Sequence, residues 1–341
     1  MPDSTPVSSP ERYLLFLGDV VEPGYAKTAF GLRDWARERC VGEIALPAAT
    51  VTAGLPRLSV RQAFDQGARE LLIVIAAPGG LIPMIWVPTL VEALEAGLDI
   101  ISGMHMKLAE EPLLRASADR LGRRLIDIRI PPTNIPIANG HRRSGHRLLT
   151  VGTDCALGKK YTALAIARGL RARGIRADFR ATGQTGIMIA GCGIPIDAVV
   201  SDFVAGAAEM LSPAAEPDHI DVIEGQGSLF HPAYAGVSLG LLHGSQPDTF
   251  VVCHDPSRLH ILGYPTCLLP TIEAVIAQTV ALGRVTNPDI RCVGAALNTV
   301  QFSAEAAQAE IDMTAQRLGL PVADPMRGGP AFERLLDACT P

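Results

Sequence analysis

The chain has 341 residues, of which 48% are hydrophobic and 19% are charged, a composition typical of a folded globular protein with one large or two smaller domains. The formal net charge of −5 argues against nucleic acid or an anionic membrane as the partner. Seven cysteines without the close spacing of a metal or redox motif indicate reduced thiols and a cytoplasmic protein.

Residues 1–12 are polar and rich in proline, and we expect them to be disordered. From residue 13 to residue 135, short apolar runs at 13–18, 43–47, 71–77, 99–103 and 124–130 alternate with helical patterns at 27–40, 90–96 and 113–121. Strands separated by helices of this length form a parallel sheet through right-handed crossovers. The pattern predicts a Rossmann-like N-terminal domain.

The uncharged stretch between Glu70 and Glu92 is long enough to suggest a membrane span. Pro78, Pro83 and Pro88 interrupt it, and a helix facing lipid could not replace the hydrogen bonds lost there. We therefore predict a buried strand, a loop and a helix in this stretch.

The segment from Pro131 to His146 carries three prolines, two glycines and polar residues, as a linker between domains does, and we place the linker at residues 136–146. A second alternation follows from residue 147 to residue 341, with apolar runs at 147–152, 177–180, 220–223, 249–255, 292–298 and 320–324. This pattern predicts a second parallel sheet, so the expected fold class is α/β with two domains.

The segment "VGTDCALGKKYT", residues 151–162, lies between a predicted strand and a predicted amphipathic helix. Converging N–H groups, the helix dipole and Lys159 would favour a phosphate there. In nucleotide triphosphatases the residue after this lysine is Ser or Thr, whose hydroxyl holds magnesium, but here it is Lys160. We therefore expect a phosphate compound that is held and not cleaved, although Asp154 could still recruit a metal.

Two further strand ends should share this edge of the sheet, because ligands of open parallel sheets bind at the carboxyl ends of strands. The first carries Glu224 and Gln226, followed by His231, and the second carries Asn298. Asn298 could read an adenine edge or could simply form a turn. Glu224 and His231 are the candidate bases, with a structural carboxylate and a satisfied loop histidine as the alternatives.

With these segments in view, the second domain resembles the P-loop fold of dethiobiotin synthetase-like enzymes. The closer resemblance, carried by "GTDCALGKKYTA", "FRATGQTGIMIAG" and "IEGQGSLFHPAYAG", is to a bacterial family whose best-described members are D-glutamate N-acetyltransferases. It covers nearly the whole chain. It implies a Rossmann-like N-terminal parallel sheet, a P-loop NTPase-like C-terminal parallel sheet and acetyl-coenzyme A as the cosubstrate.

The resemblance predicts an N-acetyltransferase that acetylates the amino group of a D-amino acid, with D-glutamate as the expected acceptor. No metal should be required, because neither the pyrophosphate nor the 3′-phosphate of coenzyme A is cleaved. The expected catalytic residues are Glu224 and His231. The expected cofactor-binding residues are Gly152, Thr153, Asp154, Cys155, Gly158, Lys159, Lys160, Tyr161 and Asn298.

The acceptor needs groups that hold its carboxylates, which hydroxyl, amide and guanidinium side chains can do. The predicted acceptor-binding residues are Arg180, Thr182, Gln184, Thr185 and Gln226. We expect a homo-oligomer that acts on a small molecule. Two other functions stay open: a magnesium- and ATP-dependent ligase or kinase of the dethiobiotin synthetase type, and a non-catalytic nucleotide-binding protein.

Overall fold

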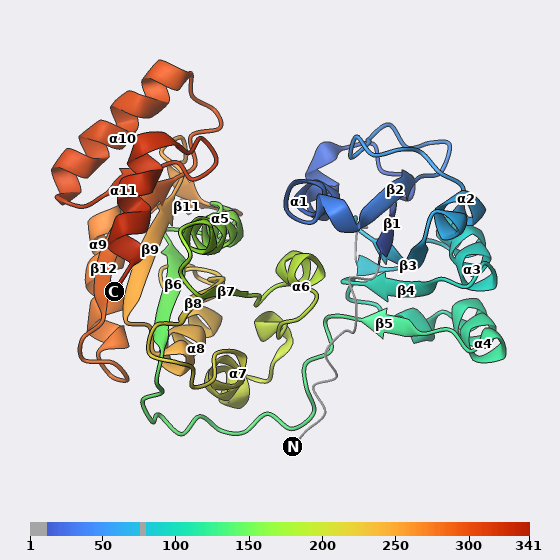
Figure 1. Ribbon diagram of the computed structural model, residues 1–341, viewed down its shortest axis with the longest axis horizontal. Coiled ribbons are helices and arrows are strands. Elements are labelled where there is room, and N and C mark those ends of the chain that lie inside the picture. Colours follow the sequence, from blue (N-terminus) through green and yellow to red (C-terminus); the bar gives the residue numbers. More distant parts are fainter. Residues whose placement is uncertain (1–11, 76–79) are drawn as a thin grey trace. The chain divides into compact units, whose positions relative to one another are not determined.

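The computed structural model describes residues 12–75 and 80–341 (Figure 1). The chain divides into two compact units, one reaching to Pro131 together with Ile187–Cys192, and one made of Pro132–Gly186 and Gly193–Pro341. Each unit is built on one parallel sheet with helices, which confirms the predicted α/β class. The predicted disordered segment lies outside the described residues, except for Arg12, which begins the first strand.

The sheet of the first unit has the strand order β2-β1-β3-β4-β5. Its core strands are buried along their length, as the near-continuous apolar runs predict for a parallel sheet covered on both faces. The strands are β1 (Arg12–Phe16), β2 (Cys40–Ile44), β3 (Ala68–Ile73), β4 (Asp99–Ser102) and β5 (Leu125–Asp127). The helices are α1 (Lys27–Trp35), α2 (Val60–Asp65), α3 (Val87–Glu95) and α4 (Pro112–Leu121).

Trp86 fills the position where this strand order would place a ligand. In such a sheet a ligand binds outside the carboxyl ends of β1 and β3, where the strand order reverses. The Trp86 indole is 1% exposed and donates a 2.8 Å hydrogen bond to Asp19, shortly after β1. A Cβ on Gly18 would lie 2.7 Å from this ring. Among the described residues, this indole therefore occupies space beside the segment that leaves β1.

The second unit carries a six-stranded sheet in the order β13-β12-β9-β6-β8-β7, together with a separate antiparallel hairpin. The strands of the sheet are β6 (His146–Gly152), β7 (Ala177–Arg180), β8 (Ile220–Ile223), β9 (Thr249–His254), β12 (Arg291–Leu297) and β13 (Val322–Ala323), and the hairpin is β10 (His260–Ile261) with β11 (Tyr264–Leu268). The helices of this unit are α5 (Lys159–Ala172), α7 (Val204–Leu211), α8 (Ala235–Ser245), α9 (Ile272–Gly283), α10 (Ala304–Leu318) and α11 (Gly329–Cys339). Helix α6 (Gln184–Ala190) begins in this unit, and its residues from Ile187 onward are counted with the first unit.

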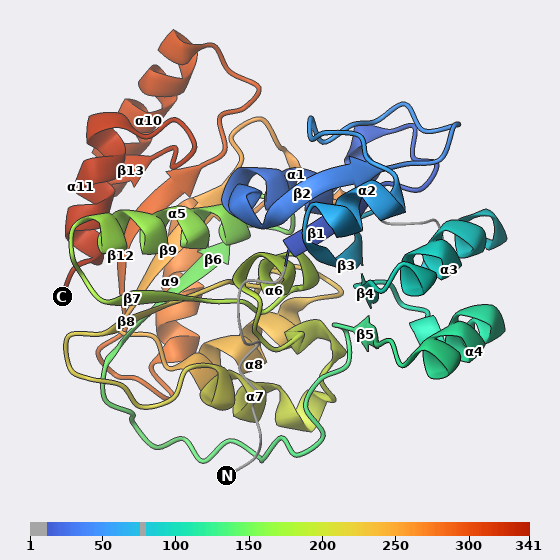
Figure 2. The same cartoon turned by 45° about the vertical axis from the view of Figure 1, so that its right-hand side comes forward.

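The central strand β6 pairs with β8 on one side and β9 on the other. Helix α5 contacts β6, β7, β8 and α11, whereas α8 contacts α7 and α9 (Figure 2). Since all these strands are parallel, the segments that leave β6, β8 and β9 start from one edge of the sheet. This edge is where the residues singled out in the sequence collect.

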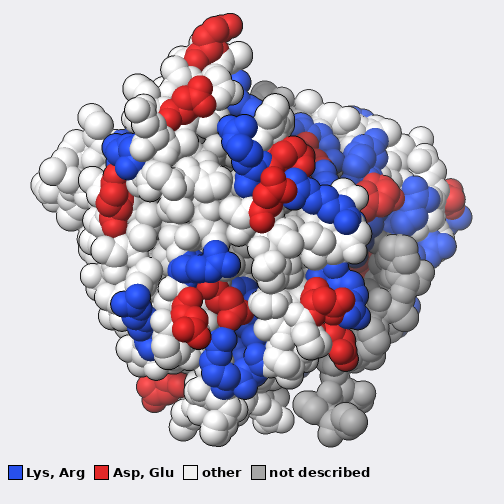
Figure 3. Space-filling view, turned by 60° about the vertical axis from the view of Figure 1, so that its left-hand side comes forward, with Lys and Arg blue, Asp and Glu red and all other residues white. Residues whose placement is uncertain are grey.

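No helix in residues 12–75 or 80–341 combines the length and apolar character that a membrane span needs. The uncharged stretch after Glu70 contains the second half of β3 and the first residues of α3, as predicted, while residues 76–79 of the predicted strand and loop lie outside the described part. On the face drawn in Figure 3, basic and acidic side chains are interspersed, without one large basic patch.

Candidate active site

A loop of six residues, 153–158, joins β6 to α5 and has the geometry of an anion cradle. Gly158 (φ +105°) and Ala156 (φ +54°) adopt left-handed backbone conformations, which turn successive N–H groups toward the same side. Within the described residues, the main-chain N–H groups of Ala156, Leu157, Gly158 and Lys159 form no hydrogen bond. These donors at the positive end of the α5 dipole suit a phosphate.

Lys159 spans the cradle. Its side chain is 6% exposed, and Nζ donates a 2.6 Å hydrogen bond to the carbonyl oxygen of Asp154. Burial lowers the pKa of Lys159, and nearby Cys253, Cys155 and Asp154 act in the opposite direction. A phosphate in the cradle would offer Nζ a charged acceptor in place of a neutral carbonyl. The ammonium of Lys160 lies 4.6 Å from the centre of the Tyr161 ring.

Asp154 is fully buried and is held by Arg258, a residue that the sequence analysis did not single out. Arg258 Nη1 donates 2.8 Å hydrogen bonds to Asp154 Oδ2 and to the Cys155 carbonyl oxygen. Leu262 N also donates to Asp154 Oδ2, at 2.7 Å, and Cys155 N donates to Oδ1 at 2.6 Å. The signal was present, because Arg258 follows the carboxyl end of β9, beside β6. These contacts show that the carboxylate braces the loop.

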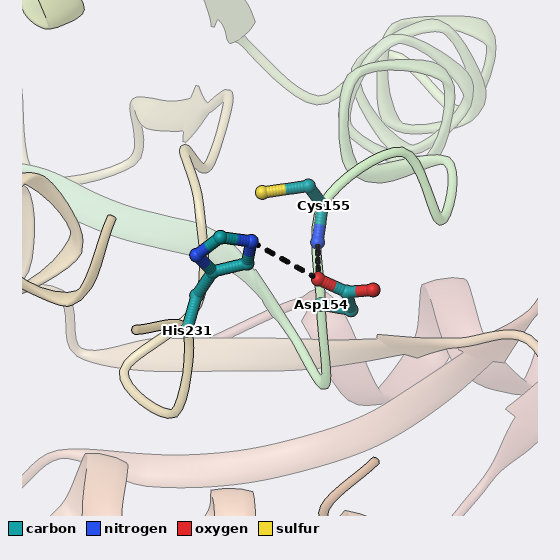
Figure 4. Close-up of side chains that lie close together, drawn as sticks. All are labelled: Asp154, Cys155 and His231. Carbon is teal, nitrogen blue, oxygen red and sulfur yellow. Dashed lines mark hydrogen bonds and ion pairs between the residues drawn. The ribbon is translucent and has the colours of Figure 1, made fainter. Parts of the chain in front are cut away.

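Asp154, Cys155 and His231 form one of two groups of described residues that could hold a metal ion, since one ligand atom of each lies within 4.8 Å of the others (Figure 4). His231 Nδ1 accepts a hydrogen bond from Ala233 N at 3.1 Å. A neutral ring that accepts at Nδ1 carries its proton on Nε2, the nitrogen 3.8 Å from Asp154 Oδ1. A protonated Nε2 and an arginine on the same carboxylate fit a hydrogen-bonded cluster better than a metal centre.

The ring of His231 is also held from both sides. It stacks on Tyr234 with ring centres 4.4 Å apart and meets Tyr264 of β11 edge-on at 5.2 Å. Its side chain is 2% exposed.

Burial raises the pKa of the Cys155 thiol, which opposes formation of a thiolate nucleophile.

Glu224, directly after β8, is buried against the loop that follows β7. Its Oε2 accepts hydrogen bonds from Thr182 N at 2.9 Å and Gly183 N at 3.2 Å. Thr182 Oγ1 donates to the Glu224 carbonyl oxygen at 2.8 Å and accepts from Gln226 Nε2 at 2.9 Å. Burial raises the pKa of Glu224, while Lys160 and these N–H groups lower it. A buried carboxylate with a raised pKa beside a phosphate cradle is a candidate for proton transfer.

Gly152, Thr153, Asp154, Cys155, Gly158 and Lys159 thus meet at one edge with Glu224, Gln226, Thr182 and His231. Gly152 and Gln226 also line a common cavity. Thr185 lies in the first turn of α6, and Gln184 Nε2 donates to both carboxylate oxygens of Asp197, at 3.1 and 3.2 Å.

Two predicted residues lie apart from this group. Arg180 Nε donates to Asp221 Oδ1 at 2.7 Å, and Asp221 lies opposite Arg147 near the start of β6. This pairing turns the guanidinium away from the carboxyl edge, so we leave Arg180 out of the acceptor pocket. Asn298 directly follows β12, which β9 separates from β6, and its Oδ1 accepts from Val300 N at 3.3 Å. This contact is a local turn and does not exclude a ligand.

Comparison with known proteins matches both halves of the chain to one family. Residues 136–336 match the P-loop domain DUF1611_C and residues 38–131 match the Rossmann-like domain DUF1611_N, both described as domains of unknown function. A crystal structure of a DUF1611 family protein from Anabaena variabilis has 34% sequence identity and a TM-score of 0.86, covering 96% of this chain and 98% of that chain. The predicted Rossmann-like and P-loop-like folds are confirmed.

Two relatives named D-glutamate N-acetyltransferase are similar over almost their whole length. The protein from Tritonibacter scottomollicae is 47% identical, covering 96% of this chain and 97% of its own. The protein from a Pseudoalteromonas species is 45% identical, covering 93% of this chain and 96% of its own.

Proposed function

The chain belongs to the DUF1611 family, and we propose that it is an N-acetyltransferase that moves the acetyl group of acetyl-coenzyme A to the amino group of D-glutamate. The observation that carries this proposal is the 47% identity to a D-glutamate N-acetyltransferase over 96% of the chain. The cradle supports it, because coenzyme A is a carrier whose phosphates are bound and stay intact during acyl transfer.

The phosphate cradle is suited to a carrier handled without magnesium. Lys160 occupies the place of the hydroxyl that holds magnesium in nucleotide triphosphatases. The carboxylate of Asp154 is committed to Arg258 and to two main-chain N–H groups. Free N–H groups and two lysines supply positive potential for phosphate oxygens. We infer that they hold one of the two anionic groups of coenzyme A.

We infer that Glu224 is the general base. The amino group of an amino acid is an ammonium at neutral pH, and only the free amine attacks a thioester. Glu224 would accept one proton from the ammonium, and the amine nitrogen would bond to the acetyl carbon. The carbon–sulfur bond would then break while the second proton that the nitrogen loses passes to the sulfur, which releases coenzyme A as the thiol. Because the pKa of Glu224 is raised, it lies nearer to the pKa of the ammonium than the pKa of an exposed carboxylate does.

His231 is placed as a hydrogen-bond donor and less well as a base. Its Nδ1 lone pair is used by Ala233 N, and the proton on Nε2 faces Asp154 and Cys155. We propose that His231 orients the loop or the ligand. Thr182 and Gln226, which lie near Glu224, contribute to the acceptor pocket, and so do Gln184 and Thr185. The cytoplasmic location and the homo-oligomeric state stay predictions.

The test is a screen of D- and L-amino acids with acetyl-coenzyme A in the presence of a chelator, following free thiol release and the mass of the product. We expect thiol release with D-glutamate, accompanied by a product heavier by one acetyl group. Turnover that requires ATP and magnesium would support the ligase or kinase alternative. Nucleotide binding without turnover of any amine or carboxylate would support a binding protein.

A further inference from the structure

A small cavity opens beside the phosphate cradle on the side of the sheet that carries α8 and α9. Gly152, the residue from which the cradle leaves β6, lines it, and so do Gly225 and Gln226, which directly follow Glu224. Its volume is about 20 Å³, somewhat more than the roughly 10–15 Å³ that one water molecule needs. The cavity can therefore hold one small group but no long chain.

The inner wall is apolar. Leu149 of β6, Leu241 and Leu242 of α8, and Val275 of α9 line the cavity and are each at most 2% exposed. Such a wall favours a methyl group over a polar one.

One polar side chain of the wall has no partner in the structure. Thr279 of α9 is fully buried, and its hydroxyl makes no hydrogen bond with any described residue. The other hydroxyls of the lining are bonded: Thr150 and Ser228 to main-chain oxygens, and Ser238 to the Gln226 carbonyl. A buried hydroxyl without a partner is uncommon and points to an acceptor that binds there.

The entrance is rich in free donors. The loop 226–229 turns at Gly227 (φ +54°), and the N–H groups of Gln226, Gly227, Ser228 and Leu229 make no hydrogen bond within the described parts of the chain. Consecutive N–H groups around a left-handed residue form a concave site for a negatively charged oxygen. Oxygen of this kind develops on the carbonyl during acyl transfer.

We propose that this cavity is the acyl subsite of the enzyme, an inference that rests on the proposed function. An acetyl group has one acceptor oxygen and one methyl group, which match the free donors and the apolar wall. The methyl group packs against Leu242 and Val275, and the carbonyl oxygen accepts from Thr279 and the 226–229 loop. Gly152 lines the cavity and directly precedes the cradle. The thioester-bearing chain of a carrier whose phosphate is bound in the cradle therefore folds back to reach the cavity. The size of the cavity then limits the acyl group to acetyl.

Thr279→Val tests the hydroxyl with almost no change in shape, and Thr279→Ser is its matched control. Removal of a hydroxyl without a native partner does not lower the thermal unfolding midpoint. We expect Thr279→Val to lower kcat/KM for acetyl-coenzyme A at least fivefold at an unchanged or higher midpoint, while Thr279→Ser stays within twofold of wild type. A Thr279→Val enzyme with full activity would overturn the role of Thr279 and with it the subsite.

Leu242→Ala tests the size limit, and Val275→Ala is a milder variant in case the first does not fold. The readout is the ratio of kcat/KM for propionyl-coenzyme A to that for acetyl-coenzyme A, which does not depend on the folded fraction. We expect this ratio to rise at least tenfold in either variant. Normal acetyl transfer with an unchanged ratio would overturn the subsite alone. A wild-type enzyme inactive with every acyl thioester would instead refute the proposed function.

Discussion

Arg258→Ala should destabilise the second unit by removing the cation that holds the phosphate cradle in shape. The guanidinium is 21% exposed and lies 2.8 Å from a fully buried carboxylate, Asp154. It also donates to the Cys155 carbonyl oxygen at 2.8 Å. Without it, Asp154 keeps its bonds from Leu262 N and Cys155 N but is a buried carboxylate that has lost its 2.8 Å ion-pair partner.

Removing one partner of a buried ion pair costs about 3–5 kcal/mol. We take the lower end, about 3 kcal/mol, because two N–H donors still satisfy the carboxylate. For a unit of this size, about 2–4 °C of midpoint is lost per kcal/mol, so the thermal unfolding midpoint should fall by roughly 6–12 °C. Arg317→Ala is the matched control: its ion pair with Glu273 has side chains 50% and 46% exposed and should contribute less than about 1 kcal/mol.

Differential scanning calorimetry of the two variants and of wild type measures these shifts. Asp154→Asn combined with Arg258→Ala should cost less than the sum of the two single changes, because a neutral amide in place of the carboxylate no longer needs the cation. The reasoning is refuted if Arg258→Ala lowers the midpoint no more than Arg317→Ala does, or if the double variant is additive.

Three further predictions concern the neighbouring strand end. Glu224→Gln should lower kcat at least about 100-fold with little change in KM. Wild type should lose activity as pH falls through the raised pKa of Glu224, and the residual rate of the variant should not show this loss. Because that pKa is raised on folding, the stabilisation by Glu224 is complete below its unfolded pKa and is lost as pH rises through the folded one. The unfolding midpoint of Glu224→Gln relative to wild type should therefore be higher at pH 8 than at pH 4, and a constant difference would contradict the raised pKa. Gly225→Ala should lower the free energy of unfolding by about 3 kcal/mol or more, since its Cβ would lie 1.6 Å from the Thr150 carbonyl oxygen. Gly236→Ala is the control: its Cβ would have no atom within 4 Å, and thermal unfolding should show a stabilisation of up to about 1 kcal/mol.

The elements of the sheets could be predicted because their signals are local. The run "RLLTVG", the glycines and the amphipathic pattern after Lys159 give β6, the cradle and α5 within one short stretch. The strand that delivers Glu224 follows from a buried apolar run in the same way. Chain order and parallel pairing then bring both strand ends to one edge of the sheet.

The partners of the side chains could not be predicted, because they come from distant positions. Arg258 lies 104 residues from Asp154. Its place after β9 indicates only that it lies near the loop, and the sequence does not show that these two side chains form a pair. The β10–β11 hairpin, which brings Leu262 N and Tyr264 to the cluster, is short and mostly exposed, and it lacks the apolar alternation that marks a strand. Arg180 has a side chain suited to a carboxylate ligand, but it pairs with Asp221 from the neighbouring strand.

Calorimetric titration with coenzyme A in the presence of a chelator tests the central claim most directly, because it asks whether the cradle holds this carrier without a metal. We expect wild type to bind, and Lys159→Ala to bind at least tenfold more weakly, a difference of about 1.4 kcal/mol. Binding that is equally strong in both proteins, or a cradle that takes and cleaves ATP only when magnesium is present, would contradict the account.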